Sequence, residues 1–309
     1  MNLLMISGKG AIETARGKRN AFYNTLEELH KYFDRIDVVC SEQGSLFGNV
    51  FFHAQVPEKE FDVMTVHEYA PFRNGRMANQ FWKKTKTPMI FEIMHIPGLP
   101  KAGNLREHIA HLMTRWYIKY DVRNAKAVRV INKQVGDWLA QRGVPREKIH
   151  VVSAMYIDLD IFKNLNIEKK YEVIYVGRRA KNKGIELFEK AGQGFKTLIV
   201  DGWAKDAHEV ATLINQSKVL VMPSYNEGGP RVVLEAFACN VPVLATPVGI
   251  VPEVVSPEFI IDWSPRRIGK KIKAVLDGTL QFIKPDLSRF EKKEAIKTYA
   301  EFIDHHAKS

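Results

Sequence analysis

The sequence predicts an α/β protein of two domains, each built on a parallel β-sheet. Short runs of Val, Ile, Met and Phe alternate with helical patterns along almost the whole chain, as expected of parallel strands joined by covering helices. A polar stretch, Ile161–Lys170, interrupts this alternation, which then resumes. The 309 residues suit two domains of about 150 residues each. We expect one domain over residues 1–162, a second over residues 163–285, and a C-terminal helix in residues 286–309 that packs back on the first domain.

The first domain is expected to begin with a buried strand at Asn2–Ser7, followed by an amphipathic helix at Asn20–Phe33. Short apolar runs predict its other strands: Arg35–Cys40, Val50–His53, Phe61–His67, Pro88–His95, Ala127–Ile131 and Ile149–Val152. Helical spacing predicts its other helices: around Met77–Thr85, Leu105–Asn124, and Lys133–Arg142, which Gly143 ends.

The second domain repeats the same order of elements. Its predicted strands are Tyr171–Val176, Phe195–Val200, Lys218–Met222, Val241–Ala245 and Phe259–Asp262. Its predicted helices are Lys183–Ala191, Asp206–Gln216, Pro230–Cys239 and Arg266–Leu276. The last amphipathic pattern, Asp286–His306, is the C-terminal helix.

Composition and cysteine content exclude several classes of protein. With 45% hydrophobic and 26% charged residues, the chain has ordinary globular composition rather than that of a disordered or collagen-like protein. Cys40 and Cys239 both fall in apolar patterns, which favours buried, reduced thiols over a disulfide framework. The first residues lack a signal-peptide pattern, and no apolar run approaches the ~18 residues of a membrane span. We therefore expect a cytoplasmic protein.

The net charge of +11 is spread over both halves of the chain. Such a surplus favours an anionic partner, which could be a nucleotide, a nucleic acid or an anionic membrane surface. The charge alone does not choose among these partners.

The clearest chemical pattern is the segment Ser224–Val255, which reads SYNEGGPRVVLEAFACNVPVLATPVGIVPEVV. Glu227 stands in a glycine-rich loop directly after a predicted strand, and Glu235 lies inside the following helix. The loop glycines Gly228 and Gly229 place backbone N–H groups near the start of that helix, where the helix dipole favours an anion. The pattern thus predicts two carboxylates beside an anion site.

This segment resembles the retaining glycosyltransferases of family 4 (glycosyl transferases group 1), which have the GT-B architecture. The residues in register with the family pattern are Ser224, Glu227, Gly228, Glu235, Ala236, Ala238, Pro242, Val243, Gly249, Pro252, Glu253 and Val254. Asn240 replaces the usual glycine and tolerates the left-handed backbone of a helix end. The resemblance implies two Rossmann-like domains facing a central cleft. It also implies that Glu235 binds the donor ribose, that Glu227 contacts the transferred sugar, and that Gly228 and Gly229 lie beside the donor.

A second match is VGRRAKNKG, Val176–Gly184. The resemblance implies that Arg178 and Lys183 bind the diphosphate of a nucleotide-sugar donor. Two fixed cations can neutralise the negative charge that the leaving diphosphate gains, without a metal ion. We therefore expect no metal or other cofactor.

The first domain matches the family more loosely. The resemblance places Gly17, at the opening of a helix, beside the donor phosphate and acceptor, although Gly8 and Gly10 could serve instead. It also places His95, at a strand end, beside the transferred sugar; His67 is a weaker candidate of the same kind. Met155-Tyr156 replaces the family's Asn-Gly at the domain junction. The region that holds the nucleotide base is shortened, which leaves Trp203, Ala204 and Lys205 for the base.

The expected function is a retaining, metal-independent glycosyltransferase that uses a UDP- or GDP-sugar and has a glycan or lipid-linked acceptor. Two alternatives stay open: transfer to modified DNA bases, and a sugar-nucleotide-binding protein without transferase activity. The oligomeric state is not predicted by any pattern.

One helix face bears on the acceptor. Arg106, Arg115, Lys119 and Arg123 interleave with apolar residues on the predicted helix Leu105–Asn124: Leu105, Ile109, Leu112, Trp116 and Tyr120. The pattern fits a helix whose apolar face covers the sheet, which we favour, or a helix that rests on an anionic membrane.

Overall fold

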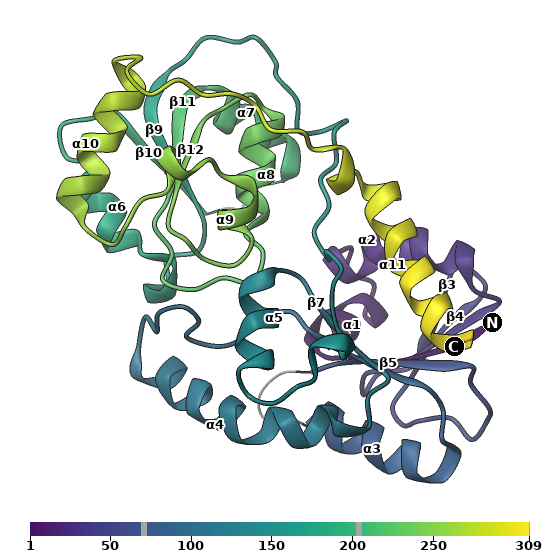
Figure 1. The fold of residues 1–309 in the computed structure, drawn as a ribbon. Coiled ribbons are helices and arrows are strands. Elements are labelled where there is room, and N and C mark those ends of the chain that lie inside the picture. Colours follow the sequence, from purple (N-terminus) through teal and green to yellow (C-terminus); the bar gives the residue numbers. More distant parts are fainter. Residues whose placement is uncertain (69–72, 202–205, 309) are drawn as a thin grey trace. The chain divides into compact units, whose positions relative to one another are not determined.

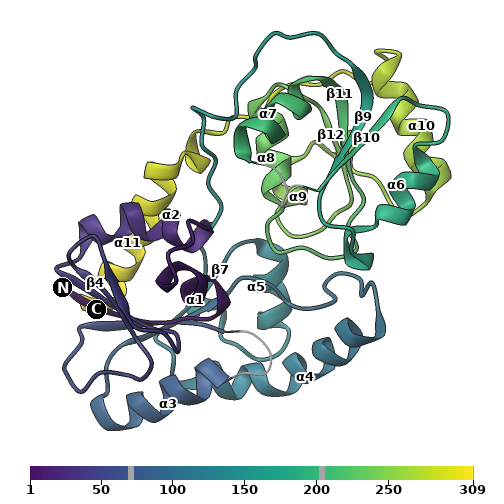
Figure 2. The ribbon, with the colours of Figure 1, turned by 180° about the vertical axis from the view of Figure 1, so that it is seen from behind.

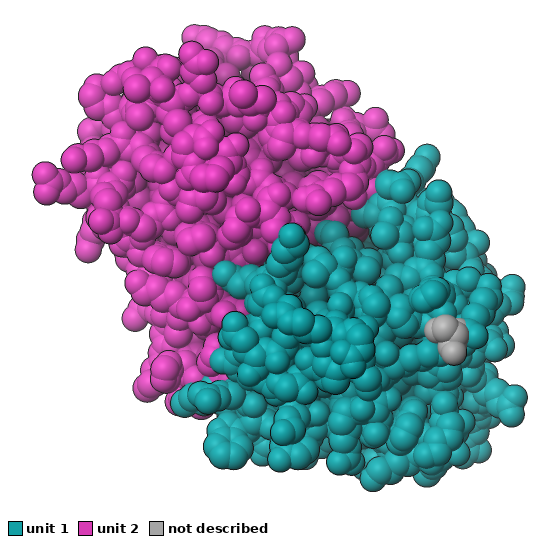
Figure 3. Space-filling model, in the orientation of Figure 1, with its two compact units in different colours: residues 1–94, 112–154, 293–309 teal, residues 95–111, 155–292 magenta. Residues whose placement is uncertain are grey.

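The computed structural model describes residues 1–68, 73–201 and 206–308 (Figure 1). The chain forms two compact units, coloured separately in Figure 3. Unit 1 comprises Met1–Met94, Leu112–Ala154 and Lys293–Ser309; unit 2 comprises His95–His111 and Met155–Lys292. The main division thus falls between Ala154 and Met155 rather than after Phe162, and the segment His95–His111 groups with unit 2.

Unit 1 contains a parallel sheet with the strand order β3-β4-β2-β1-β5-β6-β7-β8, in which only the short β3 is antiparallel to its neighbour. The strands are β1 Asn2–Ile6, β2 Arg35–Val39, β3 Gly44–Leu46, β4 Val50–His53, β5 Val63–His67, β6 Met89–Ile93, β7 Ala127–Val130 and β8 Ile149–Val151. All the predicted strands of this domain are confirmed. The sequence analysis missed β3 because a three-residue strand with mostly exposed side chains has no apolar pattern.

The helices of unit 1 are α1 Lys9–Ala15, α2 Ala21–Leu29, α3 Arg73–Thr85, α5 Lys133–Ala140 and α11 Lys292–Lys308; α4 Leu105–Asp121 begins in the residues of unit 2 and ends in unit 1. The prediction missed α1, a short helix that contains a glycine and begins after another. The last helix begins at Lys292 rather than Asp286. The Asp286 carboxylate accepts hydrogen bonds from the N–H and hydroxyl of Ser288, and this turn delays the helix.

Unit 2 contains a four-stranded parallel sheet with the order β10-β9-β11-β12. The strands are β9 Tyr171–Val176, β10 Thr197–Val200, β11 Ser217–Met222 and β12 Val243–Ala245; the helices are α6 Ile185–Ala191, α7 Ala207–Asn215, α8 Arg231–Ala238, α9 Val251–Val254 and α10 Pro265–Leu276. Helices α6 and α10 cover one face of the sheet and α7 and α8 the other (Figures 1 and 2). The predicted strand at Phe259–Asp262 is wrong, since Ile260 makes only an isolated bridge to Ala245.

Both cysteines are buried free thiols, as predicted. Burial raises the pKa of the Cys239 thiol to about 12, so this side chain is a packing residue rather than a nucleophile. Within the described residues, no helix combines the length and the apolar character needed to cross a bilayer.

Helix α4 does not cover the sheet with its apolar face, as the sequence analysis had favoured. The residues expected to cover the sheet are exposed: Leu105, Ile109, Leu112, Trp116 and Tyr120. Thr114, Ile118 and Asp121 form the buried side instead. The prediction was wrong because an amphipathic pattern indicates an apolar face but not what that face contacts.

Candidate active site

The centre of the candidate site is an ion pair between Lys183 and Glu227. The same Glu227 oxygen, Oε1, accepts a hydrogen bond from the Ser224 hydroxyl at 3.1 Å. Glu227 follows β11 and Lys183 follows β9, and these strands are neighbours in the sheet. The side chains of Lys183 and Glu227 are 22% and 13% exposed. The pair is therefore partly dehydrated but open to a ligand.

Two glycines let neighbouring loops pack tightly around the β11–α8 loop. Gly184 has φ +65°, and a Cβ there would lie 2.1 Å from the Pro223 carbonyl oxygen. Gly249 has φ +56°, and a Cβ there would lie 2.2 Å from the Gly228 carbonyl oxygen. Only glycine fits either position, because both the backbone angle and the space exclude a side chain. The close approach fixes the loop that carries Glu227.

Arg178 lies in the loop after β9, and its side chain is exposed. The Tyr175 hydroxyl donates a hydrogen bond to the Arg178 carbonyl at 3.0 Å and so supports the loop backbone. Arg178 and Lys183 belong to the same segment, residues 178–183. Four of its six residues are cationic: Arg178, Arg179, Lys181 and Lys183. Such a loop suits an anionic ligand.

Helix α8 begins at Arg231, and no side chain caps its first turn. Gly228 and Gly229 lie just before this N-terminus, whose helix dipole favours an anion. Glu235 lies farther along α8. Burial raises the pKa of its carboxyl to about 7, against the opposing effect of Arg231. At neutral pH, Glu235 is therefore shared between its protonated and charged forms.

His95 joins this site through Asn226. Its Nε2 lies 3.2 Å from Asn226 Oδ1. Asn226 is next to Glu227 in the chain. The segment that contains His95 makes a second contact with Asn226, an isolated antiparallel β-bridge at Pro100. Burial lowers the pKa of His95 although the nearby Glu227 carboxylate opposes this effect. His95, Lys183 and Glu227 thus form one cluster in unit 2.

Gly17, in contrast, belongs to unit 1. It ends α1 with φ +87° rather than opening the next helix, which begins at Ala21 after the cap Asn20. Gly8 is the N-cap of α1 and lies two residues after β1, so Gly8 opens a helix, as the sequence analysis expected of Gly17. His67 also lies in unit 1, at the end of β5, and burial lowers its pKa.

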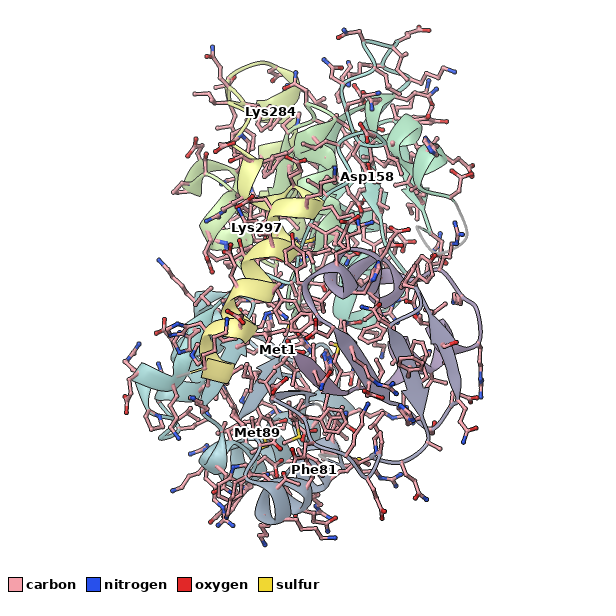
Figure 4. The ribbon with its side chains drawn as sticks, turned by 90° about the vertical axis from the view of Figure 1, so that its right-hand side faces the viewer. Met1, Phe81, Met89, Asp158, Lys284 and Lys297 are labelled. Carbon is pink, nitrogen blue, oxygen red and sulfur yellow. The ribbon has the colours of Figure 1, made fainter. Side chains whose placement is uncertain are left out.

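Sequence reasoning missed two residues of the cluster, Asn226 and Glu107, which are 119 positions apart and hydrogen bonded. It also missed an Asp-x-Asp triplet, Asp158–Asp160. Asp158, labelled in Figure 4, accepts hydrogen bonds from the N–H groups of Asp160 and Ile161 through Oδ1, so it forms a turn. Across the described residues, no three His, Cys, Asp or Glu side chains gather as a metal site would require.

The region expected to hold the nucleotide base, Trp203, Ala204 and Lys205, lies outside the described residues. Met155 and Tyr156, which replace the family's Asn-Gly, are both buried. The Arg231 guanidinium lies over the Tyr156 ring, 4.7 Å from its centroid. The replacement thus packs the junction segment against the first residue of α8.

Comparisons with known proteins bear on the fold and on the family that the second unit resembles. Residues 197–299 match the family model of Glycosyl transferases group 1. The solved structure of Alr3699/HepE from Anabaena in complex with UDP-glucose has a TM-score of 0.69 and 14% identity, covering 99% of this chain and 100% of that chain. The chain therefore has the two-domain GT-B fold, and residues 197–299 are similar to the glycosyl transferases group 1 family.

Two curated proteins that are similar in sequence have names that state a more specific activity. TuaC, a glycosyltransferase assigned to teichuronic acid biosynthesis in Bacillus subtilis (strain 168), is 37% identical over 25% of this chain and 24% of that protein. The N,N'-diacetylbacillosaminyl-diphospho-undecaprenol alpha-1,3-N-acetylgalactosaminyltransferase of Campylobacter jejuni is 23% identical over 49% of this chain and 50% of that protein. The chain thus spans half or less of the length of these relatives.

Proposed function

We propose that this protein is a retaining, metal-independent glycosyltransferase of family 4 that uses a nucleotide-sugar donor. The observation that carries the proposal is the pairing of Lys183 with Glu227 at the ends of neighbouring strands. When a donor binds, its diphosphate takes the Lys183 ammonium and the exposed Arg178 guanidinium as counter-charges. Both cations then stabilise the negative charge that develops on the leaving diphosphate, which is the role a metal ion has in other transferases.

The two carboxylates have separate roles in this proposal. Glu227, released from Lys183, contacts sugar hydroxyls and stabilises positive charge at the anomeric carbon. Glu235 accepts hydrogen bonds from the ribose hydroxyls, while Gly228 and Gly229 contribute backbone N–H groups near the donor. His95 lies beside the transferred sugar, and Gly17, or Gly8 or Gly10 in its place, approaches the donor phosphate. No enzyme nucleophile is needed, because the leaving phosphate takes the acceptor proton on the same face.

The solved structure of a protein with the same fold contains bound UDP-glucose. This supports a UDP-sugar as the donor here, with a GDP-sugar as the alternative. The acceptor is proposed to be a glycan or a lipid-linked glycan. One relative is named for transfer to a diphospho-undecaprenol acceptor, which supports the lipid-linked class.

A thermal-shift panel of UDP-, GDP-, ADP- and dTDP-sugars tests the donor assignment. One class is expected to stabilise the protein by about 2.7 kcal/mol at 100 times its dissociation constant, equally with and without EDTA. Donor affinity should fall as pH drops below about 7, because the charged Glu235 carboxylate accepts stronger hydrogen bonds from the ribose hydroxyls than its protonated form does. Glu235→Gln should remove this pH dependence. If no donor class raises the melting temperature, the proposal is wrong; donor binding without turnover on any acceptor would indicate a binding protein instead.

The exposed side of α4 supports a membrane-linked acceptor. We define the α4 surface as its exposed apolar and basic residues: Leu105, Arg106, Ile109, Leu112, Met113, Arg115, Trp116, Tyr117, Lys119 and Tyr120. Trp116 and Leu105 are 74% and 73% exposed, unusual values for large apolar side chains. The carboxylates of α4 lie elsewhere: Asp121 is buried, and Glu107 binds Asn226. Helix α3 lies beside one end of α4 in Figures 1 and 2, and its exposed Lys83 and Lys84 add positive charge near the α4 surface.

Apolar and aromatic side chains among cations, without exposed carboxylates, suit the interface of an anionic bilayer. The protein is therefore proposed to act at the cytoplasmic face of a membrane, where the α4 surface holds it beside a lipid-linked acceptor. Aromatic rings such as Trp116 would enter the headgroup region, and the cations would contact lipid phosphates.

Vesicle sedimentation tests the α4 surface. The wild-type protein should bind vesicles of phosphatidylglycerol and phosphatidylcholine, and bind pure phosphatidylcholine vesicles at least tenfold more weakly. Arg115→Gln/Lys119→Gln should lose at least tenfold in affinity, since each cation near an anionic surface contributes about 1 kcal/mol. Trp116→Ser/Tyr120→Ser should lose a similar amount. The matched controls are Lys293→Gln/Lys297→Gln on exposed α11 positions and Tyr32→Ser/Ile283→Ser at other exposed apolar positions.

Unchanged vesicle binding by both α4 variants would contradict membrane docking. Variants that lose only self-association would show instead that α4 contacts a second copy of the chain. Salt-sensitive retention on duplex DNA that depends on the same residues would favour a nucleic-acid acceptor.

A further inference from the structure

Asn226 is among the most buried polar residues of unit 2, with 1% of its surface exposed. Its amide nitrogen donates two hydrogen bonds, to the Lys101 carbonyl at 3.0 Å and to Glu107 Oε2 at 2.7 Å. Its amide oxygen faces His95 Nε2 at 3.2 Å. All three partners belong to the segment His95–His111, so one side chain organises that segment.

These partners settle which way the amide points. In the opposite orientation, the amide oxygen would face a carbonyl oxygen and a carboxylate oxygen, and three acceptors would meet with no proton between them. The observed orientation pairs both amide protons with acceptors. Glu107 is itself held by the backbone N–H of Gly103, which donates to Oε2 at 2.8 Å. The direction of the Asn226 oxygen is therefore fixed from two sides.

The oxygen of an amide accepts hydrogen bonds and cannot donate them. The His95 ring must therefore carry a proton on Nε2 to bond with it. When the ring is neutral, Nδ1 has no proton and presents its lone pair. The orientation of Asn226 thus determines which ring nitrogen can accept a hydrogen bond from a ligand hydroxyl.

We propose that Asn226 is a positioning residue that holds His95 in the neutral Nε2–H tautomer, so that Nδ1 accepts a hydrogen bond from a hydroxyl of the bound sugar or acceptor. The role of His95 rests on the function proposed above, whereas the tautomer is a property of the free protein. Glu107 supports the arrangement by fixing Asn226.

The burial of His95 agrees with a neutral ring. Burial lowers the pKa of His95; the carboxylates of Glu227 and Glu107 raise it, and the Lys183 ammonium lowers it. Among these charged groups, Glu227 has the largest effect and Lys183 the smallest, so the lowered pKa of His95 is due to its burial. The hydrogen bond to Asn226 also raises the pKa of His95, but the Asn226 amide carries no charge, and burial has the larger effect. An aspartate at position 226 would keep an acceptor oxygen but add a charge that favours the imidazolium form.

The tautomer can be measured directly in the wild-type protein. Nitrogen-15 labelled histidine and two-bond proton–nitrogen spectra, with the His95 signals assigned by comparison with His95→Gln, should show a protonated Nε2 and an unprotonated Nδ1 near pH 8. A protonated Nδ1 would overturn the proposal without any variant at Asn226. The measurement needs no donor, so it is independent of whether the protein transfers sugar.

Asn226→Asp tests the consequence for activity. The carboxylate can still accept from Nε2–H but stabilises the imidazolium form, so the acid limb of the pH profile of kcat should move to higher pH by at least one unit. At pH 7, kcat should fall at least tenfold with little change in donor KM, and activity should recover at higher pH. Glu107→Gln should retain most activity, because its amide oxygen can still accept from Asn226.

Asn215→Asp is the matched control. Asn215 is equally buried in unit 2, and its amide donates to the carbonyls of Lys163 and Ala211, away from His95. This variant should lose stability without moving the pH profile. An unchanged profile in Asn226→Asp, or an equal displacement in both variants, would overturn the assignment of Asn226. Absence of turnover in the wild type would instead count against the proposed function.

Discussion

Replacing Lys183 with alanine is expected to lower donor turnover at least 100-fold, which corresponds to about 3 kcal/mol of transition-state stabilisation. The Lys183 ammonium is mostly shielded from water and is held by Glu227 in the free protein. A fixed, partly dehydrated cation interacts more strongly with a departing diphosphate than a solvated one does. Single-turnover kinetics with saturating donor should show the loss in the chemical step rather than in binding alone.

Lys181→Ala is the control, because it removes the same charge from an exposed position two residues away. It should change turnover less than twofold. Glu227→Gln should also lower turnover about 100-fold, since an amide cannot stabilise positive charge at the anomeric carbon. Melting curves of all three variants separate lost catalysis from lost folding. Wild-type turnover in both Lys183→Ala and Glu227→Gln would end the assignment of this pair.

The part of the site that the sequence could predict lies at strand ends. Lys183 and Glu227 each follow a strongly apolar strand, and parallel strands place their carboxyl ends at one edge of a sheet. The family resemblance assigned both side chains to the donor site, and the parallel arrangement of their strands explains why the two meet. The strands themselves were predictable because Val, Ile and Met runs such as Val219–Met222 are buried on both faces.

Contacts between distant segments were not predictable. Asn226 meets Glu107 across 119 positions, and neither residue stands in a local pattern that indicates the other. The sequence also could not predict which side of α4 is buried. The pattern has the same form whether the apolar face meets a sheet, water or a membrane, and here Thr114 and Ile118 form the buried side.

A buried ion pair in unit 1 gives the second large expected effect. Arg129→Met should destabilise the protein by about 3–5 kcal/mol, because it leaves the Glu92 carboxylate buried without its counter-charge. Arg129 Nη1 donates to Glu92 Oε1 at 2.7 Å, and the two side chains are only 5% and 6% exposed. The guanidinium also donates to the carbonyls of Val152 and Ser153 at 3.1 and 2.9 Å.

The Arg129 guanidinium lies 3.6 Å from the centroid of the Tyr299 ring on α11, so the same residue joins β7, the segment after β8 and the C-terminal helix. Lys297, labelled in Figure 4, lies on the same helix and is exposed.

Urea denaturation followed by circular dichroism measures the loss of stability in Arg129→Met. Arg146→Met, which breaks an exposed pair with Asp137, should cost less than about 1 kcal/mol. Glu92→Met/Arg129→Met should recover much of the loss, because apolar residues replace both charges. Equal costs for Arg129→Met and Arg146→Met would show that Arg129 does not anchor α11 through this network.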